Sequence, residues 1–402
     1  MDFSTSGRKL AVKVLHVIDS GGLYGAETML LHLAGAQSAL GISPVICSIG
    51  ERHIARKELE AKAEALGIPV HPIRMRRGVN FVGALGILRY AKQNRFEVLH
   101  SHGYKGNILV GLIPPYLRNI PLVSTLHGWT STGAGRVLGL YEQIDRMSLR
   151  FHDAVVAVSA QMLEDARLAS SVRRRMTVIP NGIPTAAGGE TLTAQEVQNF
   201  AEFSKGAFTI GAIGRLSPEK AYHHLLEAVA ILRAEGRSVR LAVIGEGPER
   251  AHLEAQATRL GLQDSVHLAG YRNNAEKYLS LFDVFVISSL TEGCPMTLLE
   301  AARARTAIVA TSVGAIPRVV PDGQGAVLVE PGRPAALARG IARVMDDPGQ
   351  TAAMTDFAHR VFSASYTSDR MAEEYLSVYR QVLVYPVRRS GCPGPGNPCG
   401  LV

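Results

Sequence analysis

Short apolar runs alternate along the chain with longer stretches in which apolar residues recur at helical spacing. This alternation predicts repeated strand–helix–strand units with parallel sheets, and therefore an α/β protein. The runs of the first half predict strands at Leu10–Ile18, Pro44–Ile49, Val98–His100, Leu122–Leu126, Ala154–Val158 and Met176–Ile179. Those of the second half predict strands at Thr209–Ile213, Arg240–Ile244, Val266–Ala269, Val284–Ile287, Ala307–Thr311 and Ala326–Val329.

The alternation is interrupted between Ile183 and Phe203, where the chain becomes small and polar. We therefore expect a first domain over residues 1–185, a linker over 186–205 and a second domain over 206–365. Residues 366–385 are expected to form a separate helix, because one stripe of that segment carries the apolar side chains of Met371, Tyr375, Val378, Tyr379 and Val382. The tail, 386–402, is rich in Pro and Gly and is expected to be disordered.

Length and composition agree with two folded domains. A chain of 402 residues can bury two substantial cores, and contents of 47% hydrophobic and 19% charged residues are typical of soluble globular proteins. No apolar run approaches the length of a membrane span, and the N-terminus has no signal pattern. Four scattered cysteines do not form a disulfide framework. We therefore expect a cytoplasmic protein.

The net charge of +8 is unevenly distributed. Residues 1–190 contain 22 Lys and Arg against 14 Asp and Glu, whereas the second half is balanced. The excess predicts attraction to an anionic membrane surface or to a lipid-phosphate acceptor, or else it belongs to solvated helix faces. Nucleic acid is not an expected partner, because no basic strand interleaved with aromatic residues is present.

Two cations follow one predicted strand, and a helix start follows another. Arg215 and Lys220 come after Phe208–Ile213 and Gly214, and the segment Thr291–Glu300 comes after Val284–Ile287. Pro295 is expected in the first helical turn, where its missing N–H costs nothing. The unpaired N–H groups of a helix start suit a phosphate, and the two cations would complete a diphosphate clamp without a metal. The alternative is that both cations are solvated loop residues.

Two carboxylates flank this helix start. Glu292 lies at its mouth, and Glu300 lies at most roughly 12 Å further along. This is about the span from the sugar to the ribose of a nucleotide sugar, and each carboxylate could accept hydrogen bonds from hydroxyl groups. The pattern therefore predicts a nucleotide-sugar site. Alternatively, Glu292 caps its helix and Glu300 is a surface residue.

Glycines and histidines mark the first half. Gly21 and Gly22 follow a predicted strand, which indicates either a backbone close to a phosphate or sugar, or an ordinary turn. His127 follows Leu122–Leu126, at the edge where parallel sheets bind ligands. His100 and His102 could resemble a metal pair, but no third or fourth ligand is evident, so no metal is expected.

The order of these motifs resembles a known family. The motifs are Gly21-Gly22 with Gly25-Ala-Glu27, His100-Ser-His-Gly103, Thr125-Leu-His-Gly128, Ile179-Pro-Asn-Gly182, Ile213-Gly-Arg-Leu-Ser-Pro-Glu-Lys220, Val243-Ile-Gly-Glu-Gly-Pro248, Leu268-Ala-Gly-Tyr271 and Glu292-Gly-Cys-Pro-Met-Thr-Leu-Leu-Glu300. Each is weak alone, but the ordered set is specific. From about Leu10 to Tyr385 the chain resembles the retaining glycosyltransferases of family 4, which have the GT-B fold.

The resemblance implies two Rossmann-like doubly wound domains that face each other across a cleft, with the acceptor on the first domain and the donor on the second. It also implies that the C-terminal helix crosses back to the first domain. The implied donor is a UDP- or GDP-sugar, and the implied acceptor is a glycan or lipid-linked molecule of cell-envelope or exopolysaccharide synthesis. Peripheral contact with the inner membrane face would follow. No cofactor and no metal are implied.

The resemblance also implies roles for single residues. Arg215 and Lys220 would stabilise the departing diphosphate, Glu292 would hold sugar hydroxyls, and His127 would contact the donor sugar or the reaction centre. Donor binding would further involve Gly21, Gly22, Gly214, Gly293, Cys294, Pro295, Met296, Glu300 and Tyr271. Retention of configuration is implied, by a front-face route in which the leaving phosphate takes the acceptor's proton.

The chain departs from the family pattern at several positions, and two other functions stay open. Ala302, Arg305 and Arg318 stand where other residues are usual, and the glycine loop carries an added Leu23-Tyr24. A nucleotide-sugar 2-epimerase would share the fold, and so would a non-catalytic protein that binds sugar nucleotides.

Overall fold

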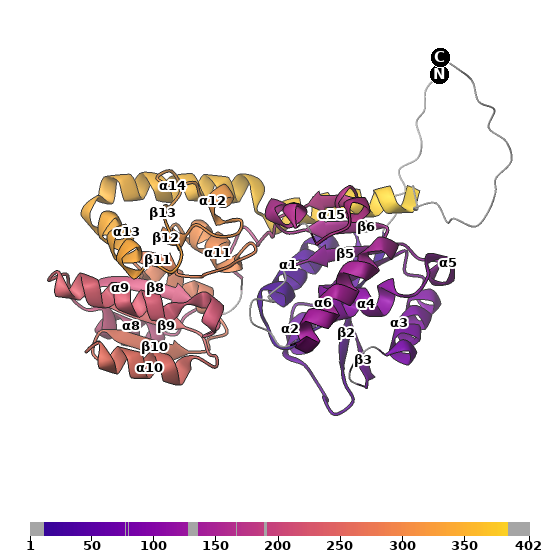
Figure 1. Ribbon diagram of the computed structural model, residues 1–402, viewed down its shortest axis with the longest axis horizontal. Helices are drawn as coiled ribbons and strands as arrows, with labels where there is room; N and C mark the ends of the chain where they lie inside the picture. The colour runs from indigo at the N-terminus through magenta and orange to yellow at the C-terminus, as the bar shows by residue number, and fades with distance from the viewer. Residues whose placement is uncertain are drawn as a thin grey trace, which may run out of the picture.

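The computed structural model describes residues 12–384 except 77, 79, 128–135, 166 and 189–190, and except the side chains of 136–138. It contains two α/β lobes that lie side by side, each built around one parallel sheet (Figure 1). The predicted tail, 386–402, lies outside the described residues. Within the described residues, no helix combines the length and the apolar character that a bilayer span requires.

The first lobe has a seven-stranded sheet in the order β3-β2-β1-β4-β5-β6-β7, with parallel pairing throughout. Its central strands are buried on both faces, which accounts for the continuous apolar runs of the sequence. The strands are β1 (Lys13–Asp19), β2 (Ser43–Glu51), β3 (Val70–Met75), β4 (Val98–His102), β5 (Leu122–Leu126), β6 (Ala154–Ala157) and β7 (Met176–Val178).

Helices connect these strands and cover the sheet. They are α1 (Gly25–Ala39), α2 (Glu58–Ala65), α3 (Phe81–Gln93), α4 (Gly103–Gly111), α5 (Pro115–Arg118), α6 (Arg136–Ser148) and α7 (Ser170–Arg173), with 3₁₀ turns η1 (Leu149–Phe151) and η2 (Ala160–Glu164). Helix α1 begins where the Tyr24 N–H donates to the Glu27 carboxylate at 3.1 Å. Glu27 of the Gly25-Ala-Glu27 motif is therefore a helix cap.

Strand β3 was not predicted from the sequence. It contains Pro72 and carries few fully buried side chains, so it lacks the apolar run that marks the other strands. Proline lacks the N–H that a central strand must donate, and β3 tolerates it because it lies at the edge of the sheet.

The second lobe has a six-stranded parallel sheet in the order β10-β9-β8-β11-β12-β13. The strands are β8 (Phe208–Ile213), β9 (Val239–Ile244), β10 (Val266–Gly270), β11 (Val284–Ile287), β12 (Ala307–Thr311) and β13 (Val327–Val329). The covering elements are α8 (Ala194–Ser204), η3 (Pro218–Lys220), α9 (Tyr222–Ala234), α10 (Arg250–Arg259), η4 (Ala275–Leu281), α11 (Met296–Ala304), α12 (Ile316–Val319), α13 (Pro334–Asp346) and α14 (Pro348–Ser365).

The expected linker, 186–205, is partly helical. Helix α8 begins with a capping box between Thr193 and Glu196. Phe200 of this helix packs against the rings of Tyr278 and Phe282 in the second lobe. The connecting segment is therefore shorter than predicted, because one buried aromatic side chain anchors what looked like a polar linker.

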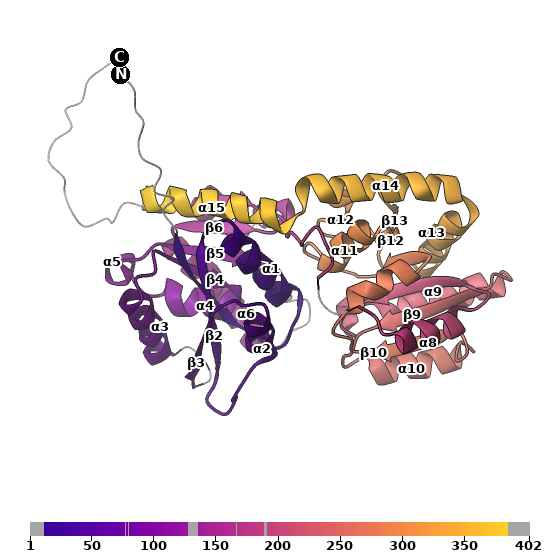
Figure 2. The same cartoon turned by 180° about the vertical axis from the view of Figure 1, so that it is seen from behind.

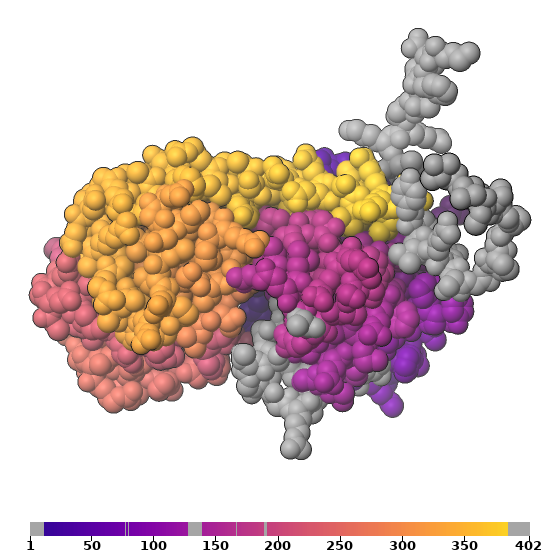
Figure 3. Space-filling model, turned by 45° about the horizontal axis from the view of Figure 1, so that its top comes forward, coloured from indigo at the N-terminus to yellow at the C-terminus, as the bar shows by residue number. Residues whose placement is uncertain are grey.

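The last helix, α15 (Ser368–Val384), returns to the first lobe and packs along α1. Figure 2 shows α14 and α15 in succession along one side of both lobes, and Figure 3 shows the same segment at the molecular surface. The Tyr379 hydroxyl accepts a hydrogen bond from Gln37 of α1 at 3.0 Å. The apolar stripe predicted for this segment is buried in the structure.

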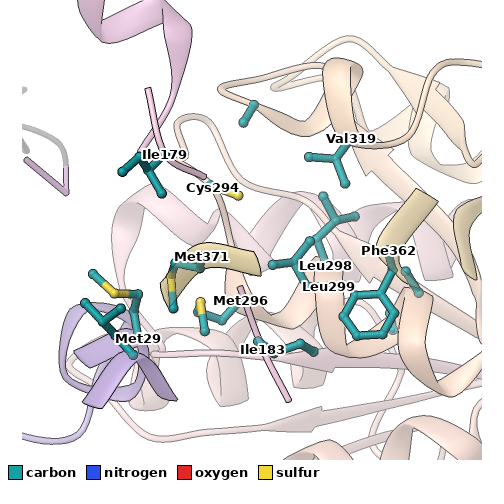
Figure 4. Packing of buried hydrophobic residues seen from close by; sticks show 14 of the residues in the cluster. Met29, Ile179, Ile183, Cys294, Met296, Leu298, Leu299, Val319, Phe362 and Met371 are labelled. Atoms are coloured by element: carbon teal, nitrogen blue, oxygen red, sulfur yellow. The ribbon is translucent and has the colours of Figure 1, made fainter. Parts of the chain in front are cut away.

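The two lobes share one hydrophobic cluster. Met29 of α1, Ile179 and Ile183 of the first lobe meet Met296 of α11 and Met371 of α15 (Figure 4). Unbranched methionine side chains fill such irregular spaces well. The cluster lies directly behind the start of α11. The same side chains therefore form the interface between the lobes and support the expected donor site.

Candidate active site

The candidate site lies where the strand order of the second sheet reverses. Strands β8 and β11 are neighbours there, and their helices leave in opposite directions along the sheet. The crevice outside the carboxyl ends of such strands is the general ligand site of open α/β sheets. The loop after β8 carries Arg215 and Lys220, and the loop after β11 carries Glu292. The fold therefore brings together the residues that the sequence placed 72 or more positions apart.

Lys220 and Glu292 form an ion pair across these two loops. The Lys220 ammonium lies 2.6 Å from the Glu292 carboxylate, with side-chain exposures of 23% and 11%. The hydroxyl of Ser289 donates to the same carboxylate oxygen at 2.6 Å. The Ser288 hydroxyl donates to the Lys220 carbonyl at 2.8 Å, which ties the two loops together. Lys220 is therefore held in place before any ligand arrives, and Glu292 retains one oxygen for a further donor.

Arg215 is exposed and lies under an aromatic ring from the other lobe. Its guanidinium carbon is 5.4 Å from the centre of the Tyr24 ring. Such a distance is within the range of a cation–π contact. Tyr24 belongs to the addition that distinguishes this glycine loop from the family pattern. The added residue therefore links the first lobe to the Arg215 loop of the second.

Close backbone contacts hold these loops, and two glycines make them possible. A Cβ on Gly245 would lie 1.9 Å from the Gly214 carbonyl oxygen, and one on Gly314 would lie 2.2 Å from the Glu292 carbonyl oxygen. No side chain fits at either position. The turn at Gly245-Glu-Gly-Pro248 thus has a packing role beneath the Arg215 loop.

The start of α11 faces the first lobe. Pro295 is its N-cap residue, one position before the predicted first turn. The Asn181 side chain donates to the Cys294 carbonyl at 2.8 Å, and a Cβ on Gly293 would lie 3.2 Å from the His127 carbonyl oxygen. The start of α11 and the residue His127 are therefore neighbours from different lobes.

The side chains of Cys294 and Met296 are not available to a donor. Both are less than a tenth exposed, and both pack into the cluster between the lobes (Figure 4). Burial raises the pKa of the Cys294 thiol to about 12, so this thiol stays protonated and apolar. Both were predicted as donor-binding residues. Packing explains their presence, and only their backbone could contact a ligand.

Glu300 lies two turns into α11 and is partly buried. Burial, with a smaller contribution from the nearby Glu276 carboxylate, raises the pKa of Glu300 to about 7, while Arg303 acts in the opposite direction. A desolvated carboxyl with a raised pKa gains from a hydroxyl donor, because the hydrogen bond replaces lost water. The Glu300 carboxyl is therefore suited to accept a hydrogen bond from a hydroxyl group.

The other predicted donor residues come from both lobes. A Cβ on Gly21 would meet open space, so no contact within the described residues requires glycine there. Gly22 accepts from the Ser20 hydroxyl at 2.8 Å and lies under the Tyr24 ring. Tyr271 follows β10 and is half exposed. Burial, Glu58 and Tyr24 raise the pKa of the Tyr271 phenol, which places this ring beside the first lobe.

A cluster of buried histidines lies behind His127. The structure supplies the third histidine that the sequence did not reveal: His16 of β1 pairs in register with His100 of β4. Nitrogens of His16, His100 and His102 lie within 4.8 Å of one another, a spacing that could hold a metal ion. The statement that no third ligand is evident was therefore wrong. Only the sheet register brings these residues together.

Hydrogen bonds already occupy both ring nitrogens of these three histidines. His16 contacts Gln37 and His102, at 2.8 and 3.0 Å. His100 contacts Tyr379 and Thr125, at 2.7 and 2.8 Å. His102 also contacts His127 at 3.4 Å. A metal would have to break this network, so the donor set fits a hydrogen-bonded core better than a metal centre.

Comparison with known proteins agrees with this geometry. Residues 24–187 match the family model described as Glycosyltransferase Family 4, and residues 194–361 match the model described as Glycosyl transferases group 1. The two models together cover most of both lobes and all the motifs of the candidate site from Tyr24 onward.

Several characterised relatives are similar over most of their length. A 2-deoxystreptamine glucosyltransferase from Streptomyces kanamyceticus is 25% identical, and the alignment covers 89% of this chain and 99% of that protein. A D-inositol 3-phosphate glycosyltransferase from Thermobispora bispora is 29% identical, with 74% and 75% covered. Among solved structures, Anabaena Alr3699/HepE in complex with UDP has a TM-score of 0.77 at 20% identity, covering 92% of this chain and 100% of that one. The fold is therefore GT-B.

Proposed function

Since the chain belongs to the group 1 and family 4 glycosyltransferases and is an enzyme of that class, we propose that it moves a sugar from a UDP- or GDP-sugar to a glycan or lipid-linked acceptor. Anomeric configuration would be retained. The pathway would be cell-envelope or exopolysaccharide synthesis, on the cytoplasmic side of the membrane.

One observation carries the proposal: two cations and a helix start converge where the second sheet reverses its strand order. Lys220 is fixed there by Glu292, and Arg215 stands free of ion pairs within the described residues. A diphosphate needs several positive donors around it, and guanidinium, ammonium and helix N–H groups supply them. Another structure of the same Anabaena protein is a complex with UDP-glucose, which agrees with such a ligand.

In the proposed complex each residue has a distinct role. Glu300 accepts from the ribose, and Glu292 and His127 face the sugar. The glycosidic C–O bond to the diphosphate breaks while the acceptor oxygen bonds to the same face of the anomeric carbon. The acceptor's proton passes to the leaving phosphate oxygen, and Arg215 and Lys220 stabilise the charge that develops on it. The clamp supplies its own cations, so no metal takes part in this proposal.

The experiment that tests this function is a donor panel. Thermal shift with UDP, GDP and their sugars identifies the base, and slow release of nucleoside diphosphate from the matching sugar reports transfer to water. A transferase gives this release and accelerates it with acceptor. A 2-epimerase would instead yield an isomerised nucleotide sugar, and a binding protein would yield neither product.

The proposed membrane contact is supported by a surface on the first lobe, which we term the α3–α5 surface. It consists of exposed Phe81, Val82, Leu85, Tyr116 and Leu117, with the basic side chains of Arg76, Arg89 and Lys92 beside them. The Lys92 ammonium donates to the Leu117 carbonyl at 2.9 Å, which makes the two helices one surface. It faces away from the second lobe (Figures 1 and 2). Apolar groups among cations suit an anionic bilayer.

Vesicle co-sedimentation tests this contact. Arg74 is unsuitable for substitution because it pairs with the buried Glu60 at 2.8 Å. Arg76→Ser with Arg89→Ser removes about 1 kcal/mol per charge, so binding should weaken roughly thirtyfold at low salt. Arg173→Ser with Arg174→Ser is the control of equal charge at the C-terminal end of α7. Equal loss of vesicle binding in both double variants, or no vesicle binding by the wild type, would contradict the proposed membrane contact of this surface.

A further inference from the structure

Three histidines and one amide form a continuous line of hydrogen bonds from α1 to the end of β5. The line runs from Gln37 through His16 and His102 to His127, with contacts of 2.8, 3.0 and 3.4 Å. The side chains of Gln37, His16 and His102 are fully buried or nearly so. Gln37 and His16 do not touch the proposed donor site, and His102 reaches it only through His127, so the polarity of these three residues needs another explanation.

We propose that Gln37, His16 and His102 are positioning residues that hold His127 as the tautomer with its proton on Nε2. Nδ1 of His127 is then a lone-pair acceptor for a substrate hydroxyl. This inference rests on the proposed function only for the nature of that substrate.

The direction of hydrogen-bond donation along the line follows from the side-chain oxygen of Gln37. The Gln37 oxygen Oε1 can only accept a hydrogen bond, so Nε2 of His16 must carry the proton. Burial lowers the pKa of His16 to about 4, so this ring is neutral and its Nδ1 has no proton. Nδ1 of His16 must then accept from Nε2 of His102.

The same reasoning applies to His102 and His127. Burial lowers the pKa of His102 well below its usual value, so its Nδ1 is an acceptor and receives the proton of His127 Nε2. Burial also lowers the pKa of His127 to about 4. A neutral His127 with its proton on Nε2 leaves Nδ1 as its acceptor nitrogen. That nitrogen has no hydrogen-bond partner within the described part of the chain.

The Gln37 amide also contacts the C-terminal helix. The Gln37 Nε2 group donates to the Tyr379 hydroxyl at 3.0 Å, which leaves that hydroxyl to donate to His100 Nδ1 at 2.7 Å. His100 then donates from Nε2 to Thr125, which also contacts Tyr375. A reversed amide would reverse every bond of the line and would place a proton on His127 Nδ1. The contact of α15 with α1 therefore belongs to the same hydrogen-bonded network as His127.

The direct test is the protonation state of the histidine nitrogens in the ligand-free protein. Two-bond nitrogen–proton NMR correlations on histidine-labelled protein distinguish the two tautomers, and His127→Gln identifies the signal. We expect Nε2–H at His127 in the wild type and in Gln37→Glu, which keeps an acceptor toward His16. Gln37→Met should give a mixture of tautomers. Tyr375→Phe, which alters only the far branch, is the matched control and should resemble the wild type.

The functional readout is separate from this measurement. With an identified donor, Gln37→Met should lower kcat/KM about tenfold, the loss expected for one hydrogen bond at the reacting sugar, and Gln37→Glu should recover most of it. Nδ1–H at His127 in the wild type would overturn the inference, as would an unchanged tautomer in Gln37→Met or signals that shift on chelation of a metal. These NMR outcomes hold even if the proposed transferase activity is not found.

Discussion

Removing the Lys220 ammonium should reduce turnover strongly and stability only modestly. Lys220→Met keeps the apolar stem and deletes the charge. In the structure this ammonium lies 2.6 Å from Glu292 and is less than a quarter exposed, so it is prepositioned for the diphosphate. A charge-assisted contact that strengthens as the leaving group departs contributes about 2–4 kcal/mol. Loss of that contact corresponds to a decrease in kcat/KM of about 30- to 1000-fold.

The pair with Glu292 sharpens this expectation. Ser289 still donates to Glu292 in the variant, so that carboxylate keeps one partner. Initial rates of nucleoside diphosphate release, with unfolding curves as the check on folding, give the comparison. Arg215→Ala should fall in the same range, whereas Arg333→Ala should be neutral because its pair with Glu330 is highly exposed. Near-normal kcat/KM in both clamp variants, with the fold intact, would refute the assignment.

Three further outcomes are expected. Transfer should persist in EDTA, because the clamp supplies cations, and complete loss restored by Mn²⁺ or Mg²⁺ would contradict this. The raised pKa of Glu300 means that the folded protein holds this proton more tightly than the unfolded chain, so its contribution to stability falls as pH rises from about 4.5 to about 7. In urea unfolding experiments, the free energy of unfolding of Glu300→Gln should fall less steeply with rising pH than that of the wild type. Parallel pH profiles of the two proteins would reject this. Tyr379→Phe leaves the Gln37 Nε2 group and the His100 Nδ1 atom without their buried hydrogen-bond partner and should cost about 2–4 kcal/mol of unfolding free energy, against about 1 kcal/mol for Tyr375→Phe; equal costs would contradict the network.

Much of the fold follows from local pattern alone. Buried parallel strands are continuous apolar runs, and all of them except β3 were predicted from such runs. Strand β3 escaped because an edge strand needs fewer apolar residues and tolerates Pro72. Helix α8 was not predicted because Phe200 meets its partner rings, Tyr278 and Phe282, only in the folded structure.

Charged site residues at the ends of strands could be predicted from the sequence. Residues in a segment that also packs between the lobes were harder to predict. Lys220 and Glu292 lie together. The position of Lys220 in the loop after one strand and of Glu292 before a helix start suggested this arrangement. Cys294 and Met296 belong to the same motif, yet they serve the interface between the lobes. His16 lies inside a strand with no local signal, and only the pairing of β1 with β4 places it beside His100.

The most direct test of the central claim is a crystal structure with the nucleotide sugar that the donor panel identifies. The account predicts the diphosphate beside the start of α11, within hydrogen-bond reach of Arg215 and Lys220, with the ribose on Glu300 and the sugar toward His127. A diphosphate bound away from both cations, for example on the Gly21–Gly22 loop alone, would contradict the account.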